Sequence, residues 1–189
     1  MSPDNRELGD VRTGAAYEAG RAADRSRLAE SAAQRRVNLG ADLVLVFETR
    51  ETVRASLEEL LRAERASDPE RIVAETAAFA GMLAGDKELA ATLYVDVADP
   101  AALADRVAEL GDLSAAVWLE VAGSRVAARS DSAESGAGGW HVVFPLDDAQ
   151  LRTLRQGGAV SVVVDHPLLR ATAALDADQV RAVTADLRG

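Results

Sequence analysis

Four residues of this sequence have side chains suited to acid–base or ligand-binding chemistry and stand where a site could form: Glu48, Arg62, Glu64 and His166. Glu48 ends an apolar run, "LVLVF", and the segment "TRETVRASLEELLRAE" that follows is dense in Glu and Arg. Carboxylates, guanidinium groups and imidazoles bind polar ligands and transfer protons. These residues therefore either form a site or belong to a solvated helix beside a sheet.

Glu64 lies in line with the apolar face of the helix expected after residue 49. Counting 53, 57, 60 and 64 places it on the stripe of Val53, Leu57 and Leu60. A carboxylate on that stripe is at least half buried and needs a partner. One interpretation is an ion pair with Arg35 or Arg36, or next with Arg62. The other is a ligand-binding or catalytic carboxylate beside Glu48.

The other charges of this helix have the spacing of a solvated face. Glu58 and Arg62 are four residues apart, and Glu59 and Arg62 are three apart, so either carboxylate can pair with Arg62 on the helix surface. Glu59, with Arg35 and Arg36, is therefore a candidate for a structural ion pair.

The tripeptide "DHP" at 165–167 is the second candidate region. Asp165 and His166 end an expected strand, where sites in open sheets often lie. Successive strand residues point to opposite faces, so the two side chains are not a dyad. Turn formation, with Asp165 in an ion pair, is favoured over catalysis. His141 is expected to be a structural histidine in a strand.

The first half of the chain must position Glu48 through a buried strand and a helical hairpin. Residues 42–48 are apolar at both parities, which is typical of a strand covered on both faces. Thr49 can cap the next helix, to about Ser67, with Thr52 as a competing cap. "SDPE" starts a second helix, with Asp68 as cap and Pro69 at its first position. Residues 1–13 read as a disordered tail, and 14–36 as a helical arm with a weak, Ala-rich face.

The second half is rich in strands. Strands are expected near 89–97, 115–130, 140–146, 159–166 and 168–175, and helices after Asp99, Asp147 and Asp176. The sequence thus predicts an α/β fold: one domain over 37–189 with a mixed sheet flanked by the helical hairpin, preceded by a tail and arm over 1–36.

Composition excludes several classes of function. The chain has 189 residues and a net charge of −10, which disfavours nucleic acid and anionic membranes. No apolar run reaches the roughly 18 residues of a membrane-spanning helix. There is no cysteine, and the two histidines lack metal-ligand spacing. No glycine-rich nucleotide motif is present. We expect a cytoplasmic protein with no bound cofactor or metal.

Five segments follow one another along the chain: "RRV" (35–37), "FETRETVRASLEELLRAE" (47–64), "ELAATLYVDV" (88–97), "HVVFPL" (141–146) and "VDHPLLRA" (164–171). In this order they resemble an uncharacterised bacterial family, domain of unknown function 3501. The family's helix resembles F-E-x-x-x-T followed by E-M-L-R-x-E, and Leu60 here stands where Met is usual. The likeness covers roughly residues 30–187. Family members resemble proteins encoded beside rubrerythrin-like di-iron proteins and iron–sulfur proteins of the heterodisulfide reductase type.

Two functions remain open. The resemblance implies an accessory, non-catalytic protein in a bacterial redox or oxidative-stress system, which binds a redox protein or forms a homo-oligomer. The alternative is a small-molecule-binding protein or enzyme that uses Glu48, Arg62, Glu64 and His166.

Overall fold

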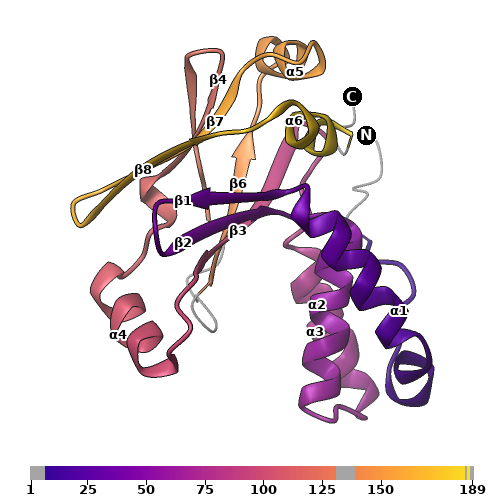
Figure 1. Cartoon of the computed structure of the whole chain (residues 1–189). Coiled ribbons are helices and arrows are strands. Elements are labelled where there is room, and N and C mark those ends of the chain that lie inside the picture. Colours follow the sequence, from indigo (N-terminus) through magenta and orange to yellow (C-terminus); the bar gives the residue numbers. More distant parts are fainter. Residues whose placement is uncertain (1–6, 131–138, 186, 188–189) are drawn as a thin grey trace.

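The computed structural model of the chain describes residues 7–130, 139–185 and 187, which form eight strands and six α-helices (Figure 1). The strands are β1 (Arg36–Leu39), β2 (Leu43–Phe47), β3 (Glu88–Val95), β4 (Val117–Val121), β5 (Ser124–Ala127), β6 (Gly139–Pro145), β7 (Val160–His166) and β8 (Leu169–Ala174). The helices are α1 (Gly14–Ala33), α2 (Arg50–Ala63), α3 (Pro69–Ala80), α4 (Pro100–Leu110), α5 (Asp148–Arg155) and α6 (Ala177–Thr184), with a short 3-10 turn, η1, at Ser114–Ala116.

The strands form two four-stranded sheets. Sheet A has the order β1-β2-β3-β6 and sheet B the order β5-β4-β7-β8. Every strand pairing of the described residues is antiparallel. The predicted α/β class is confirmed, but the strands divide between two antiparallel sheets where one mixed sheet was expected. Apolar residues at both parities identify a strand that is covered on both faces. They do not show whether the neighbouring strand is parallel or antiparallel, or to which sheet it belongs.

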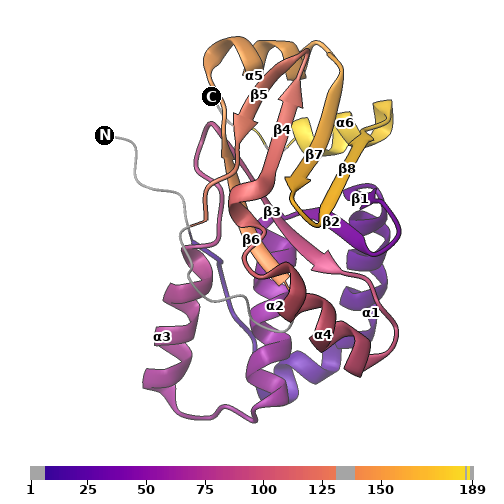
Figure 2. The same ribbon diagram turned by 90° about the vertical axis from the view of Figure 1, so that its left-hand side faces the viewer.

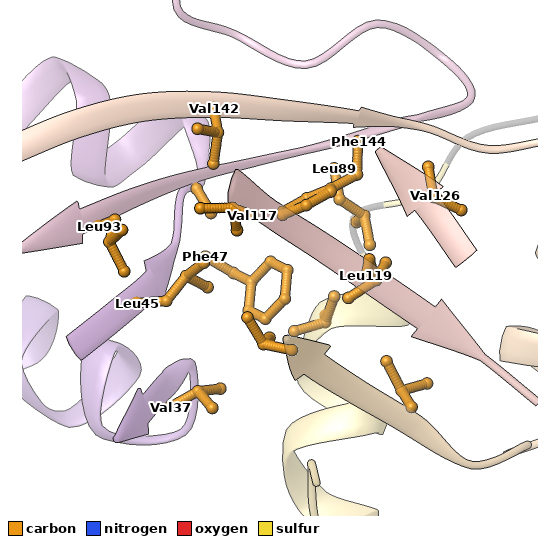
Figure 3. Packing of buried hydrophobic residues seen from close by; sticks show 14 of the residues in the cluster. Val37, Leu45, Phe47, Leu89, Leu93, Val117, Leu119, Val126, Val142 and Phe144 are labelled. Carbon is orange, nitrogen blue, oxygen red and sulfur yellow. The ribbon is translucent and has the colours of Figure 1, made fainter. Parts of the chain in front are cut away.

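The main hydrophobic core lies between the two sheets. Along β2, Leu43, Leu45 and Phe47 point to this core, because alternate residues of a strand share a face. Figure 3 shows Leu45 and Phe47 of sheet A facing Leu119 of sheet B. The rings of Phe47 and Phe144 are 6.4 Å apart at their centroids. The predicted buried strand at 43–47 is therefore confirmed.

The opposite face of sheet A is covered by helices. Seen from two directions, sheet A lies between sheet B and the group of α1, α2 and α3 (Figures 1 and 2). A second apolar cluster, which the sequence did not lead us to expect, holds α2 to α3; its buried members are Leu8, Val53, Leu57, Leu61 and Leu83. Sheet A is thus covered on both sides, which explains the two-sided apolarity of β2.

Local sequence signals set the helix starts as expected. The Thr49 hydroxyl accepts from the Thr52 backbone N–H at 3.1 Å, and the Thr49 N–H donates to the Thr52 hydroxyl at 2.8 Å. Asp68, Asp99, Asp147 and Asp176 cap the later helices through their side chains. Helix α2, which Thr49 caps, ends at Ala63, before the expected end at Ser67.

The N-terminal region is more ordered than its composition suggests. Residues 1–6 of the predicted tail lie outside the described residues, but Leu8 is buried against α2, so the expected disorder is wrong for residues 7–13. Helix α1 lies at the edge of the molecule beside α2 (Figure 1) and buries only Tyr17. An apolar contact that the polar composition concealed therefore fixes the segment before the arm. The boundary near residue 36 stays a prediction.

None of the helices in the part of the chain that the structure describes is both long and apolar enough to cross a bilayer.

The β4–β5 turn gives a test of the fold. Ala122 and Gly123 both have positive φ, 47° and 84°, as a two-residue hairpin turn requires. Asn tolerates this backbone region better than Ala, so Ala122→Asn should raise the free energy of unfolding by about 0.5 to 1 kcal/mol. Urea denaturation measures the change. Gly123→Ala, the control, should lower the same quantity, and equal stability of both variants would contradict the turn assignment.

Candidate functional site

A cleft of about 520 Å³ lies between α1 and α2 and reaches the helix-covered face of sheet A. Sheet A contributes Val46, Glu48 and Tyr94, so these residues form its floor. Helices α1 and α2 form the walls. Arg12, from the segment before α1, also lines it.

The pleat of β2 and β3 places the polar side chains of the floor. Glu48 directly follows β2, and its backbone N–H donates to the Ala90 carbonyl at 2.8 Å, which continues the sheet. It shares the parity of Val46, while Phe47 points to the main core. Val46 pairs with Thr92 in the register of β2 and β3. Glu48, Thr92 and Tyr94 therefore lie on one face of sheet A.

Two hydroxyl groups hold the Glu48 carboxyl. The Thr92 hydroxyl donates to Glu48 Oε1 at 2.7 Å, and the Thr52 hydroxyl donates to Oε2. Burial raises the pKa of Glu48 above its ordinary value, and the two hydroxyl hydrogen bonds only partly oppose this effect. Glu48 keeps some exposure, and because it lines the cleft, a molecule in the cleft can reach it.

Tyr94 lies beside Glu48 with 40% of its surface exposed. Burial of the phenol raises the pKa of Tyr94, and the negative charge of Glu48 raises it further. Gly139 is the cross-strand neighbour of Tyr94, and a Cβ built there would lie 3.1 Å from Tyr94 Cε1. A glycine at position 139 thus leaves room for the tyrosine ring across β6.

Ion pairs between the walls cross the cleft. Arg21 binds Glu59 with Nε to Oε1 at 2.8 Å, and Arg27 Nη1 lies 3.1 Å from Glu51 Oε2. The hydrogen bond from Arg21 lowers the pKa of Glu59. These contacts join α1 to α2 near the surface, where each ion pair contributes little to stability.

The Arg12–Glu58 pair is of a different kind, because the Glu58 side chain is only 1% exposed. Arg12 donates to this carboxylate from its backbone N–H at 2.9 Å, from Nε at 3.0 Å and from Nη2 at 2.8 Å. Arg12 Nη2 also donates to Asp24 of α1 at 2.7 Å. The hydrogen bond from Arg12 lowers the pKa of Asp24. One guanidinium group therefore ties the N-terminal segment to both walls.

The predicted burial of Glu64 is wrong, and Glu58 is the buried carboxylate of α2. Glu64 is the C-cap of the helix, is exposed and pairs with Arg71. At the C-terminal end of α2 the apolar stripe no longer faces the rest of the protein. Residues 7–13 cover the side of the helix that carries Glu58. Arg62 Nε donates to Glu18 Oε1 at 2.6 Å rather than to a carboxylate of its own helix.

Of the remaining ion-pair candidates, Arg36 and Glu59 have other partners than those expected. Arg36 Nη2 lies 2.6 Å from Asp96 Oδ2, and Glu59 pairs with Arg21. Asp165 is in an ion pair with Arg170, across β7 and β8 at 3.1 Å. Arg35 is buried beside β1. Of these four residues only Glu59 lines the cleft.

The two histidines lie in strands of different sheets. His166 ends β7 at the turn to β8, and its Nδ1 accepts from the Leu168 N–H at 3.3 Å, as turn formation predicts. His141 is opposite Thr92 in the register of β3 and β6.

The structure does not bring the four candidate residues together. Glu48 and Glu64 flank a helix of 14 residues, a separation of about 20 Å at 1.5 Å per residue. His166 belongs to sheet B. Of the four, only Glu48 lines the cleft. It is joined there by Thr52, which the sequence marked only as a competing helix cap, and by Arg12 and Tyr94, which the sequence did not single out. The alternation of apolar residues in β3 was a signal for Thr92 and Tyr94, because it places them on the face opposite Leu93.

In the described ranges, no group of three or more His, Asp or Glu side chains is arranged to hold a metal ion.

Comparison with known proteins gives a family and a fold. A family model described as "Protein of unknown function (DUF3501)" matches residues 7–187. A solved structure of a protein of unknown function from Burkholderia pseudomallei is similar with a TM-score of 0.82 and 27% sequence identity, covering 91% of this chain and 93% of that chain. The search of curated proteins gave no match.

Removal of Arg12 should destabilise the protein strongly. Arg12→Gln leaves the Glu58 carboxylate buried without a cation, which costs about 3 to 5 kcal/mol in the free energy of unfolding. Arg62→Gln, the matched control, breaks the exposed ion pair of Arg62 on α2 with Glu18 on α1 and should cost under about 1 kcal/mol. Urea denaturation compares them. For the same reason Glu58→Ala should cost more than Glu64→Ala. Equal loss in the two arginine variants would contradict the burial of Glu58.

Glu48→Gln should change how stability depends on pH. The raised pKa means that Glu48 binds a proton more tightly when folded, so its ionisation opposes folding. The free energy of unfolding of the wild type should fall relative to the variant as pH rises from the ordinary value of 4.5 through the raised pKa. The variant should be the more stable protein at pH 8, and the difference should disappear at acid pH.

Urea denaturation at a series of pH values measures this difference. Glu51→Gln is the control, because Glu51 is an exposed carboxylate of the same cleft and pairs with Arg27. A Glu48→Gln variant that is less stable than wild type at pH 8 would show that the carboxyl is ionised at no cost.

Proposed function

This chain belongs to the DUF3501 family, and we propose that it is a small-molecule-binding protein whose ligand occupies the cleft between α1 and α2. The observation that carries this proposal is the half-buried residue Glu48, which lines the floor of a cleft of about 520 Å³. Small-molecule sites commonly have volumes of about 300 to 1,000 Å³ and combine apolar walls with a few polar groups.

The residues of the cleft are suited to holding a ligand. Val46, Leu28 and Ala55 offer apolar surface, while Glu48, Thr52 and Tyr94 offer hydrogen-bonding groups at the floor. The two threonine hydroxyls that hold the Glu48 carboxyl keep it in one position before a ligand arrives. Such preorganisation lowers the cost of ordering side chains on binding.

Movement of α1 supplies a route for exchange of the ligand. This helix buries only Tyr17, and its outer contacts with α2 are ion pairs such as Glu18–Arg62 and Arg27–Glu51. Exposed ion pairs are worth about 0 to 1 kcal/mol each. The end of α1 beyond Asp24, which Arg12 does not hold and where Arg27–Glu51 is an exposed contact with α2, can therefore move at small cost.

From the family resemblance we also propose that the ligand-bound protein serves as an accessory partner in a cytoplasmic redox or oxidative-stress system. Support comes from the setting that the resemblance implies and from the absence of cysteine in the sequence, which suits a protein that reports on a ligand better than a thiol electron carrier. A redox protein and a second copy of this chain are the partners considered.

A cleft-filling variant tests the binding function. Ala55 lies on α2 and lines the cleft, so the indole of Ala55→Trp should occupy the ligand volume. Ala74→Trp, on the exposed surface of α3, is the matched control. Ligand-observed NMR with defined amines, carboxylic acids, phosphate esters and sugars measures binding.

At least one of these classes should bind the wild type and Ala74→Trp, with at least a tenfold loss of affinity in Ala55→Trp, about 1.4 kcal/mol. Binding that Ala55→Trp leaves unchanged, or no binding of any class, would contradict the proposed function.

A further inference from the structure

We propose that the ligand of this cleft carries an organic ammonium group, which pairs with the Glu48 carboxylate and lies against the ring of Tyr94. This inference rests on the proposed binding function and names the chemical class that the floor of the cleft recognises. It depends on the charge pairing of the cleft, on the free acceptor positions of Glu48 and on the exposed face of Tyr94.

The charge pairing of the cleft singles out Glu48. The other acidic residues that line it are all bound to arginine: Asp24 and Glu58 to Arg12, Glu51 to Arg27, and Glu59 to Arg21. Glu48 is held by hydroxyl groups alone among the described residues. A carboxylate in a cleft with this many guanidinium groups, yet bonded to none, is open to a cation that enters with the ligand.

The Glu48 carboxylate has acceptor capacity left for such a cation. A carboxylate has about four lone-pair positions, and the two threonine hydroxyls use two of them. An ammonium group brings donors and a positive charge to the same place. Charge-assisted hydrogen bonds of this kind are roughly twice as strong as those between neutral groups. A cation would also favour the ionised form of Glu48, which burial disfavours.

Tyr94 supplies a second surface that suits an organic cation. Tyr94 lines the cleft beside Glu48, the residue as a whole is 40% exposed, and its ring lies across Gly139. The face of a tyrosine ring attracts an ammonium group within about 6 Å. A carboxylate next to an aromatic face is a common arrangement for amines, whereas a calcium ion requires about six to eight oxygen ligands.

The charge of Glu48 disfavours an anion at this position. Five arginines line the cleft: Arg12, Arg21 and Arg27 are paired with acidic side chains, Arg25 attracts the charge of Glu59, and Arg54 lies on α2. An anionic group at the floor would be repelled by the Glu48 carboxylate, so the repulsion from Glu48, and not a shortage of arginines, disfavours it. The chain as a whole has a net charge of −10, which raises the local concentration of cations.

A matched set of three probes tests the inference: benzylamine, benzyl alcohol and benzoate, which share one ring and differ in charge. Their dissociation constants for the full chain are measured by ligand-observed NMR at low salt and pH 7.5. Benzylamine should bind at least tenfold tighter than the other two. Glu48→Gln should weaken benzylamine by about tenfold or more and change benzyl alcohol by less than about twofold. Tyr94→Leu, which keeps an apolar side chain, should weaken benzylamine by about threefold.

Two controls separate this inference from the proposed function. Glu70→Gln removes an exposed carboxylate of α3, outside the cleft, so it should leave benzylamine binding within about twofold. If benzoate or benzyl alcohol binds as tightly as benzylamine and Ala55→Trp displaces it, the ammonium inference is overturned while the binding function stands. If benzylamine does not bind, or binds equally to Glu48→Gln, the ammonium inference is overturned as well.

Discussion

The buried pair of Arg12 and Glu58 is the constraint on which the walls of the cleft depend. A carboxylate that is 1% exposed must have a cation, and here the cation comes from a segment 46 residues earlier in the chain. Arg12 also binds Asp24, so the same guanidinium fixes the position of α1, which otherwise buries only Tyr17. Leu8 completes the attachment by packing among the apolar residues of α2 and α3. The cleft exists because this charge is neutralised from outside the helix that carries it.

The floor of the cleft follows from the two-sided burial of sheet A. One face must be apolar throughout, because it packs against sheet B around Phe47 and Phe144. The other face is covered by helices only in part, so it can carry polar groups where the cover is open. Glu48 and Thr92 stand at that position, and Tyr94 is partly exposed beside them. The alternation of a strand thus allows a polar site to lie one residue away from the core.

Local chemistry made much of this fold predictable. Asp68 and Asp99, each followed by proline, mark helix starts by side-chain capping, and the run 43–47 marks a buried strand. The partition into two antiparallel sheets was not predictable from these signals, since pairing depends on contacts distant in sequence. Glu58 was missed for the same reason. Its spacing to Arg62 is typical of a solvated face, and only the covering segment with Arg12 shows that the face is buried. Glu48 was found because it ends a strand. Of its two hydroxyl partners, Thr52 is four residues away, and Thr92 is 44 residues away and is brought to it by the pairing of β2 with β3.

Glu58 on α2 and Glu48, just before that helix, are carboxyl groups in opposite surroundings. Glu58 is fully buried and accepts three hydrogen bonds from Arg12, two from the guanidinium and one from the backbone N–H, so its charge is compensated within the protein. Glu48 is less buried, has only hydroxyl donors, and its pKa is raised because the surroundings disfavour its charge. Stability alone would favour either an arginine partner for this carboxyl group or an apolar residue in place of Glu48. A carboxyl group kept at a cost in stability, at the floor of a cleft and in reach of solvent, is typical of a residue retained for what it binds. Glu58 therefore holds the walls of the cleft together, and Glu48 is the residue that the cleft presents to a ligand.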